Sequence, residues 1–168
     1  DRLRNAHQAG HRRRRRQEKA VTPTYWTQAS QALAQTDPVM AELVERHAGE
    51  SIISRGDPFA TLVRSIIGQQ ISVKAADSVW ARLIAALPAL TPAAVLACPT
   101  EQLRACGLSA RKAEYVSDLA AHFDGGQIHT HRWPAMEDAE IIAELTAVRG
   151  IGVWTAEMFL IFNQLRPD

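Results

Sequence analysis

Residues 147–159, AVRGIGVWTAEMF, place two glycines on either side of one isoleucine, between two apolar segments with helical periodicity. Glycine accepts positive φ and lets another group approach the backbone closely, because it has no Cβ. Gly150 and Gly152 therefore predict a tight hairpin between two helices, with Ile151 pointing inward to lock them together. The N–H groups exposed by such a turn suit an anion such as a DNA phosphate. A plain glycine helix end before a new helix is the alternative, and the glycine pair alone favours it.

The rest of the chain past residue 20 has helical periodicity as well. From Pro58, apolar residues recur at the spacing of one helix face, which predicts a helix packed against the core: Phe59, Leu62, Val63, Ile66 and Ile67. Ser72, Ser109 and Asp138 are expected to cap the helices that follow them. Residues 125–137 are expected to be irregular, and further helices are expected over residues 25–35, 38–48, 72–87, 93–97, 102–106, 110–123, 139–148 and 153–165. The sequence has no run of alternating strand residues and no solenoid repeat, so the fold class is all-α.

Charge separates an N-terminal arm, residues 1–20, from a helical domain, residues 21–168. The arm carries eight Lys and Arg against two acidic residues, a net charge of +6; the remainder carries eleven against sixteen, a net charge of −5, which gives +1 in total. The arginine run at residues 11–16 is able to contact polyanions, and a plain solvated tail explains it equally well. The helical domain has no basic excess, so DNA binding there would need backbone amides and a few well-placed cations.

Several classes of protein are disfavoured by the sequence. No segment approaches the roughly 18 consecutive apolar residues of a membrane span, and the basic N-terminus lacks the apolar stretch of a secretory signal. Cys98 and Cys106 fit a reducing compartment and are expected to be small buried hydrophobes, with neither a disulfide nor a metal. His129 and His131 lack a cysteine or carboxylate at a familiar ligand spacing, so they are expected to be a pair of loop residues.

Three blocks of sequence occur in a familiar order and spacing. Residues 145–156 have the pattern L-x-x-V-x-G-I-G-x-W-T-A, residues 57–83 read DPFATLVRSIIGQQISVKAADSVWARL, and residues 103–120 read LRACGLSARKAEYVSDLA. Together they resemble the helix-hairpin-helix DNA glycosylase superfamily, and most closely its 3-methyladenine DNA glycosylase II branch. The resemblance spans roughly residues 38–168, leaves residues 1–20 outside, and implies the helix-hairpin-helix glycosylase fold.

The resemblance implies a monofunctional DNA glycosylase that excises alkylated, 3-methyladenine-like purines in base excision repair, by base flipping and N-glycosidic hydrolysis. Its partner would be double-stranded DNA containing alkylated bases. We expect a monomer that needs no organic cofactor and is cytoplasmic, in a bacterial nucleoid. Two alternatives stay open: a non-enzymatic helix-hairpin-helix DNA-binding module, and a helical protein-interaction domain in which GIG is only a turn.

The resemblance assigns DNA contacts to three places in the chain. Gln69 or Gln70 would enter the space left by the flipped base, with Gln70 as the first choice; an amide pair that caps a helix end or bonds the next loop is the alternative. Arg111 and Lys112 would meet a phosphate or belong to a solvated helix start, and Tyr115 would pack or stack. The hairpin would bind a phosphate through Arg149, Gly150, Ile151 and Gly152.

The resemblance also implies a base pocket and a cation site. Trp154 stands where lyase-type members have a lysine, so Schiff-base chemistry is excluded at this position. Its indole would stack on a cationic purine, with Met158 one turn later on the same helix face; a buried core tryptophan is the alternative. Hairpins of the family hold a monovalent cation through backbone carbonyls, and a Na⁺ or K⁺ ion here would be bound by Thr146, Val148 and Ile151.

No catalytic residue is expected within this sequence. Glycosidic cleavage needs a carboxylate that stabilises the oxocarbenium-like sugar and orients water. In the family this aspartate lies about twenty residues after the second hairpin glycine, at about position 172–174 here, beyond Asp168. Asp168 matches an earlier, non-catalytic acid, so the domain is expected to be truncated at its C-terminus. Asp138 and Glu157 are expected to belong to helix structure.

Overall fold

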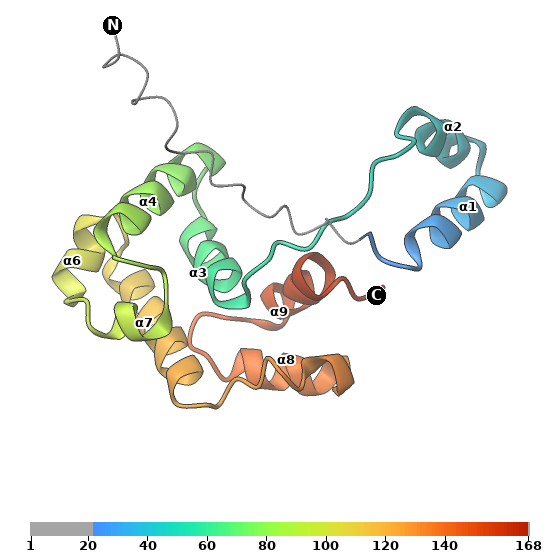
Figure 1. Cartoon of the computed structure of the whole chain (residues 1–168). Helices are drawn as coiled ribbons and strands as arrows, with labels where there is room; N and C mark the ends of the chain where they lie inside the picture. Colours follow the sequence, from blue (N-terminus) through green and yellow to red (C-terminus); the bar gives the residue numbers. More distant parts are fainter. Residues whose placement is uncertain (1–21, 168) are drawn as a thin grey trace, which may run out of the picture.

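The computed structural model describes residues 22–167, which form helices and connecting turns with no strand among them (Figure 1). The predicted all-α fold class is confirmed. The basic arm and Asp168 lie outside the described residues, so the boundary of the helical domain near residue 21 stays a prediction. No helix in the described part is long and apolar enough to cross a membrane.

Every predicted helix is present. In chain order they are α1 (Trp26–Thr36), α2 (Pro38–Arg46), α3 (Pro58–Gly68), α4 (Val73–Ala86), α5 (Pro92–Leu96), α6 (Thr100–Ala105), α7 (Ala110–Asp124), α8 (Asp138–Thr146) and α9 (Val153–Phe159). A 3-10 turn, Trp133–Ala135, lies within the segment expected to be irregular. The last helix was expected to be one continuous α-helix, but after Phe159 it widens into a π-helical turn, Leu160–Gln164.

Two of the three expected serine and aspartate caps are confirmed. The Oγ of Ser72 accepts the N–H of Ala75, and the Oγ of Ser109 accepts the N–H of Lys112. The prediction for Asp138 is wrong by one residue, because Glu137 and Glu140 form a reciprocal capping box that starts α8. Asp138 is the first residue of α8.

The core is built around α3. Its predicted apolar stripe is at most 3% exposed, and the helix contacts α4, α7 and α9. Phe59 packs edge-on against Phe123 with ring centres 5.2 Å apart, and Trp133 does the same with Phe159 at 5.4 Å. In Figure 1, α3 lies between α4 and α9. A hydrogen bond from Gln69, just after α3, to Gly150 brings the C-terminal end of α3 to the α8–α9 turn.

The N-terminal helices stand apart from this body. In Figure 1, α1 and α2 form a hairpin to one side, joined to α3 by the extended segment that follows α2. Neither helix has a fully buried side chain, and Leu33 and Val39 are 49% and 63% exposed. The candidate site residues that the structure describes therefore lie on α3 to α9 and the turns between them.

The π-helical turn fastens the chain end to the entry of α3. Asn163 is buried there, and its Nδ2 donates to the carbonyl of Gly56 at 2.9 Å and to the Oγ1 of Thr61 at 3.1 Å. The N–H of Arg55 donates to the carbonyl of Phe162 at 3.0 Å. These bonds satisfy a buried polar side chain, as burial requires.

Candidate nucleic-acid interface

The turn between α8 and α9 is tight and is closed by one backbone hydrogen bond. The N–H of Ile151 donates to the carbonyl of Val148 at 3.1 Å, and the Ile151 side chain is 4% exposed, as the inward orientation predicted. Gly150 has a φ of +86°, where a side chain is strained. A Cβ at Gly150 would also overlap the ring of Tyr115. The fold therefore requires glycine at position 150 for two reasons.

Gly152 is a different case. Its φ of −95° and ψ of 170° are open to any residue, and a Cβ built there meets no atom within 4 Å. Nothing inside the described structure explains why this residue has no side chain. The open space lies in front of the first N–H groups of α9, so a ligand that approaches the backbone closely would fill it.

Two acidic residues of α7 hold Arg149 in the turn. The backbone N–H of Arg149 donates to Oδ2 of Asp118 at 2.8 Å, and its guanidinium lies 3.3 Å from Oε2 of Glu114 in an exposed ion pair. Sequence reasoning did not find Asp118. The sequence feature that could have indicated Asp118 is its position three residues after Tyr115, on the same face of the helix.

The turn between α3 and α4 carries the two glutamines. The N–H of Ile71 reaches the carbonyl of Gly68 at 3.5 Å, and the third residue of this turn, Gln70, has a φ of +56°. Gln70 is exposed, whereas Gln69 is half-buried and its Nε2 donates to the carbonyl of Gly150 at 2.8 Å. The structure thus separates the pair: Gln69 is bonded to the α8–α9 turn, and Gln70 projects from the surface.

Lys112 lies beside the same turn. Its Nζ donates to the carbonyls of Ile67 and Gln69, at 2.7 Å each. Burial lowers the pKa of the Lys112 ammonium from its ordinary value of 10.5. Lys112 is therefore not part of a freely solvated helix start, while its neighbour Arg111 is exposed. The phosphate contacts predicted for both residues stay predictions.

Trp154 and Met158 follow the hairpin on α9. Trp154 is 70% exposed, so the alternative of a buried core tryptophan is wrong. Met158 is half-buried one turn later. Val153 beside Trp154 is 55% exposed, which makes the start of α9 an apolar surface. The role of Trp154 and Met158 as walls of a base pocket stays a prediction.

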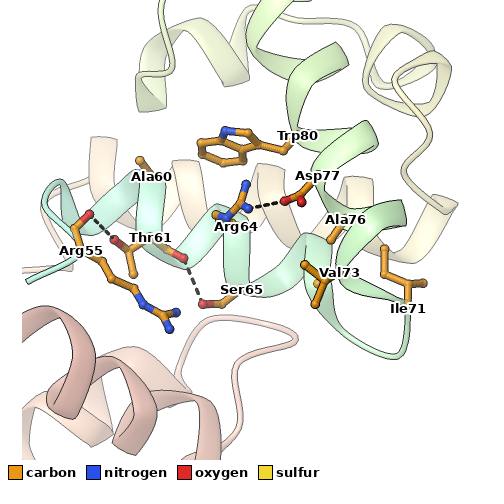
Figure 2. A pocket seen from close by; sticks show the side chains of 11 residues that line it. Arg55, Ala60, Thr61, Arg64, Ser65, Ile71, Val73, Ala76, Asp77 and Trp80 are labelled. Carbon is orange, nitrogen blue, oxygen red and sulfur yellow. Dashed lines mark hydrogen bonds and ion pairs between the residues drawn. The ribbon is translucent and has the colours of Figure 1, made fainter. Parts of the chain in front are cut away.

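A pocket of about 560 Å³ lies on the outer side of α3 and α4 (Figure 2). Arg64 stands at its centre, with its guanidinium over the ring of Trp80 and paired with Asp77. Neither Trp154 nor Met158 lines this pocket. Arg55, the second arginine of the pocket, lies over the ring of Phe162.

The carbonyls named for a monovalent cation lie on the α8–α9 turn. The hydroxyl of Thr146 donates to the carbonyl of Ile142 at 2.7 Å, which leaves the backbone carbonyl of Thr146 as its donor to a metal. The carbonyl of Val148 accepts the N–H of Ile151 and keeps a second lone pair. Neutral carbonyl oxygens suit a hard cation, so the chemistry of this donor set fits Na⁺ or K⁺.

A polar cluster behind the hairpin was not found from the sequence. The carboxylate of Glu144, on α8, accepts the indole N–H of Trp133 at 3.0 Å and the backbone N–H of His129 at 3.2 Å, and lies 2.6 Å from His129 Nδ1. Burial alone raises the pKa of Glu144, but these hydrogen bonds outweigh it and leave the pKa below 4.5. The cluster ties α8 to the segment before it, which explains His129 without a metal.

Within residues 22–167, no group of three or more His, Cys, Asp or Glu side chains is arranged to hold a metal ion. Cys98 and Cys106 are free thiols; Cys106 is buried as expected, and Cys98 is half-buried.

Comparison with known proteins identifies the family. Residues 63–159 match the family described as "HhH-GPD superfamily base excision DNA repair protein". This range contains the glutamine turn, α7 and the complete glycine hairpin. The chain belongs to this superfamily, and the resemblance to it is confirmed.

The relatives carry 3-methyladenine glycosylase names. The chain is 32% identical over 135 residues to DNA-3-methyladenine glycosylase 1 of Schizosaccharomyces pombe, covering 77% of this chain and 58% of that protein. It is 34% identical over 128 residues to the DNA-3-methyladenine glycosylase of Saccharomyces cerevisiae, covering 67% of this chain and 41% of that protein. The chain thus spans about half the length of these curated relatives.

Solved structures agree with the fold. The crystal structure of the DNA-3-methyladenine glycosidase of Bacillus halodurans has a TM-score of 0.72 at 33% identity, covering 83% of this chain and 65% of that one. The 3-methyladenine DNA glycosylase of Schizosaccharomyces pombe, solved in complex with abasic DNA, has a TM-score of 0.71 at 30% identity, covering 81% and 69%. Both support the branch of the superfamily inferred from the sequence.

Proposed function

We propose that the protein is a monofunctional DNA glycosylase that removes alkylated purines from double-stranded DNA in base excision repair. The observation that carries the proposal is the pair of adjacent turns. Gly152 leaves open space for a phosphate at the α8–α9 turn, and Gln70 projects from the α3–α4 turn beside it. The Gln69 bond to the Gly150 carbonyl joins the two turns directly. The relatives' names supply the class of lesion.

Each turn would have its own part in base flipping. The backbone N–H groups from Gly152 onward, at the start of α9, would bind one phosphate, since glycine leaves the backbone accessible. Gln70 would enter the stack where the damaged nucleotide leaves it, because an extruded base leaves a gap that a side chain fills. Arg111 and Arg149, both exposed, would add positive charge near the DNA backbone, although Arg149 shares its charge with Glu114.

Trp154 would select the lesion. An alkylated purine is positively charged, and an indole face attracts a cation. Trp154 is 70% exposed at the start of α9, so its side chain is accessible to a flipped base. Tryptophan has no amine for a Schiff base, so the DNA strand would stay intact.

Two further groups complete the proposal. The carboxylate that stabilises the sugar cation and orients water is the aspartate that the resemblance predicts at about position 172–174. A monovalent cation on the carbonyls of Thr146, Val148 and Ile151 would add positive potential beside the bound phosphate.

The proposal is tested by base release from methylated duplex DNA, with a form of the protein that continues past residue 168. Free 3-methyladenine should appear by chromatography, while the strand stays uncut until alkali is added. Trp154→Leu should lower the rate of release by about tenfold or more, since a desolvated cation–π contact contributes about 2 kcal/mol. Trp80→Leu, a half-buried tryptophan of α4 that lines the Arg64 pocket and not the hairpin, is the control and should keep the rate.

Binding without release would exclude the enzyme and favour a helix-hairpin-helix DNA-binding module. Absence of salt-dependent DNA binding would exclude both and favour a protein-interaction domain.

A further inference from the structure

The ammonium of Lys112 is used inside the protein. It donates to the carbonyls of Ile67 and Gln69 at 2.7 Å each, so two of its three hydrogens are bonded to the end of α3. The last carbonyls of a helix have no partner within the helix, and a cation near them is favourable. The bond to the Gln69 carbonyl lies immediately before Gln70, so it acts on the peptide that sets the direction of that residue.

Gln70 needs such support. Its φ of +56° is a left-handed conformation that residues with a Cβ adopt at an energetic cost. Strained residues persist where the surrounding contacts fix them, and they gather at functional sites. The turn's own closing bond, from Ile71 N–H to Gly68 O, is long at 3.5 Å. The conformation of Gln70 therefore depends on contacts from outside the turn.

Helix α7 supplies contacts to both turns from one face. Lys112 binds the α3–α4 turn, Tyr115 packs against Gly150, and Asp118 accepts the N–H of Arg149 at 2.8 Å. These three residues are spaced three apart, so they follow one another along the helix surface. The Gln69 amide closes the connection by donating to the Gly150 carbonyl.

We propose that Lys112 is a positioning residue: it holds Gln70 in its projecting conformation and, through Gln69, in fixed register with the phosphate-binding hairpin. This inference rests on the proposed function, because it explains how two parts of the DNA site are kept at a constant separation. These parts are Gln70, which would enter the base stack, and the hairpin, which would bind a phosphate. It differs from a phosphate contact by Lys112, since the ammonium is half-buried and engaged with carbonyls.

The test compares two variants that remove the same charge. Lys112→Met removes both carbonyl bonds, whereas Lys74→Met removes an exposed lysine at the start of α4. Affinity is measured by titration of an undamaged duplex and of a duplex with one abasic site, each at several salt concentrations. Hydrogen exchange of residues 68–71 is measured in the free proteins.

Lys112→Met should reduce the preference for the abasic duplex by about tenfold, while affinity for the undamaged duplex and its salt dependence stay unchanged. Exchange at residues 68–71 should become faster. Lys74→Met should leave both the preference and the exchange unchanged. If Lys112→Met weakens both duplexes equally and lowers the salt slope by about one, Lys112 is a phosphate contact and the proposal is overturned. Unchanged preference or unchanged exchange also overturns it.

A second variant covers the case in which Lys112→Met does not fold. Gln69→Leu keeps the lysine and breaks the connection to the hairpin, and it should also lose the preference for the abasic duplex. Gln102→Leu is its control, because Gln102 donates to the Ala86 carbonyl at 3.4 Å away from this site. A wild-type chain that binds both duplexes equally would instead refute the proposed function, and the positioning role with it.

Discussion

Two turns of this protein have the same plan and different residues at the same place. Each has four residues, 68–71 and 148–151, and each is closed by an N–H of the fourth residue near the carbonyl of the first. In each the third residue is left-handed, but it is Gly150 in one and Gln70 in the other. The Tyr115 ring leaves no room for a Cβ at Gly150, whereas Gln70 is exposed. A strained side chain stands where a glycine would fit, which indicates that the side chain itself is required.

Replacing Gly150 with alanine should have the largest effect. The added Cβ meets the Tyr115 ring and a positive φ, and overpacking together with a left-handed residue costs about 3 kcal/mol of unfolding free energy. Denaturant unfolding measures this loss. The double variant Gly150→Ala/Tyr115→Ala should lose less unfolding free energy than the sum of the losses of the two single variants, because the two residues are in contact. A change below about 0.5 kcal/mol for Gly150→Ala would contradict the packing described here.

The hydrogen bonds of Glu144 to Trp133 and His129 hold α8, the first helix of the hairpin, in place. The α3–α4 turn takes no part in these bonds, so a Glu144 variant affects one turn and not the other. Glu144→Gln should cost about 1–2 kcal/mol at neutral pH, because the hydrogen bonds to a charged acceptor are weakened. The folded pKa of Glu144 lies below its ordinary value of 4.5, so the unfolded chain binds the proton more tightly. Its contribution is thus present above about pH 4.5 and is lost as the pH falls through the lower folded pKa.

Thermal unfolding from neutral to acidic pH checks this sign. The variant should lose less stability in acid than the wild type does. Equal losses for the two proteins would show that other carboxyl groups set the acid dependence.

Gly152 should separate binding from folding. Asparagine is a good N-cap residue, so Gly152→Asn should change the unfolding free energy by no more than about 0.5 kcal/mol. Its side chain would fill the open space in front of α9 and should weaken binding to undamaged DNA by about tenfold. Fluorescence anisotropy with a labelled duplex measures the affinity. If this variant binds DNA with full affinity, the hairpin is not part of the DNA-binding site.

Gln70→Gly should also have only a small effect on folding. Glycine relieves the left-handed strain but loses more backbone entropy, so the unfolding free energy should change by about 1 kcal/mol or less. The preference for an abasic duplex over an undamaged one should nevertheless be lost. If Gln70→Gly keeps that preference, the two turns differ for a reason unrelated to DNA.

The helices were predictable because each is encoded locally. The apolar stripe of α3 and the serine caps at Ser72 and Ser109 need only neighbouring residues, and the structure contains them. The π-helical turn was not predictable in this way, because Asn163 is bonded to Gly56 and Thr61, more than one hundred positions earlier in the chain.

The features of the candidate site also fall into two groups, those that short patterns encode and those that depend on residues far apart in the chain. The glycine hairpin and the exposed glutamine could be named from short patterns and a family resemblance. The bond between Gln69 and Gly150, the clash that fixes Gly150, and the carbonyl contacts of Lys112 all depend on how α3, α7 and α8 come together. Sequence patterns therefore identify which segments meet DNA, while packing decides which of their side chains support the others.

The bond between Gln69 and Gly150 also has a kinetic consequence. Its two residues are 81 positions apart, so the contact forms only when a long loop of chain has closed. Closing such a loop costs entropy that later contacts must compensate, and distant contacts slow folding. We therefore expect the two turns to become aligned late in folding. An incompletely folded chain would contain most of these helices and still lack a properly spaced surface for DNA.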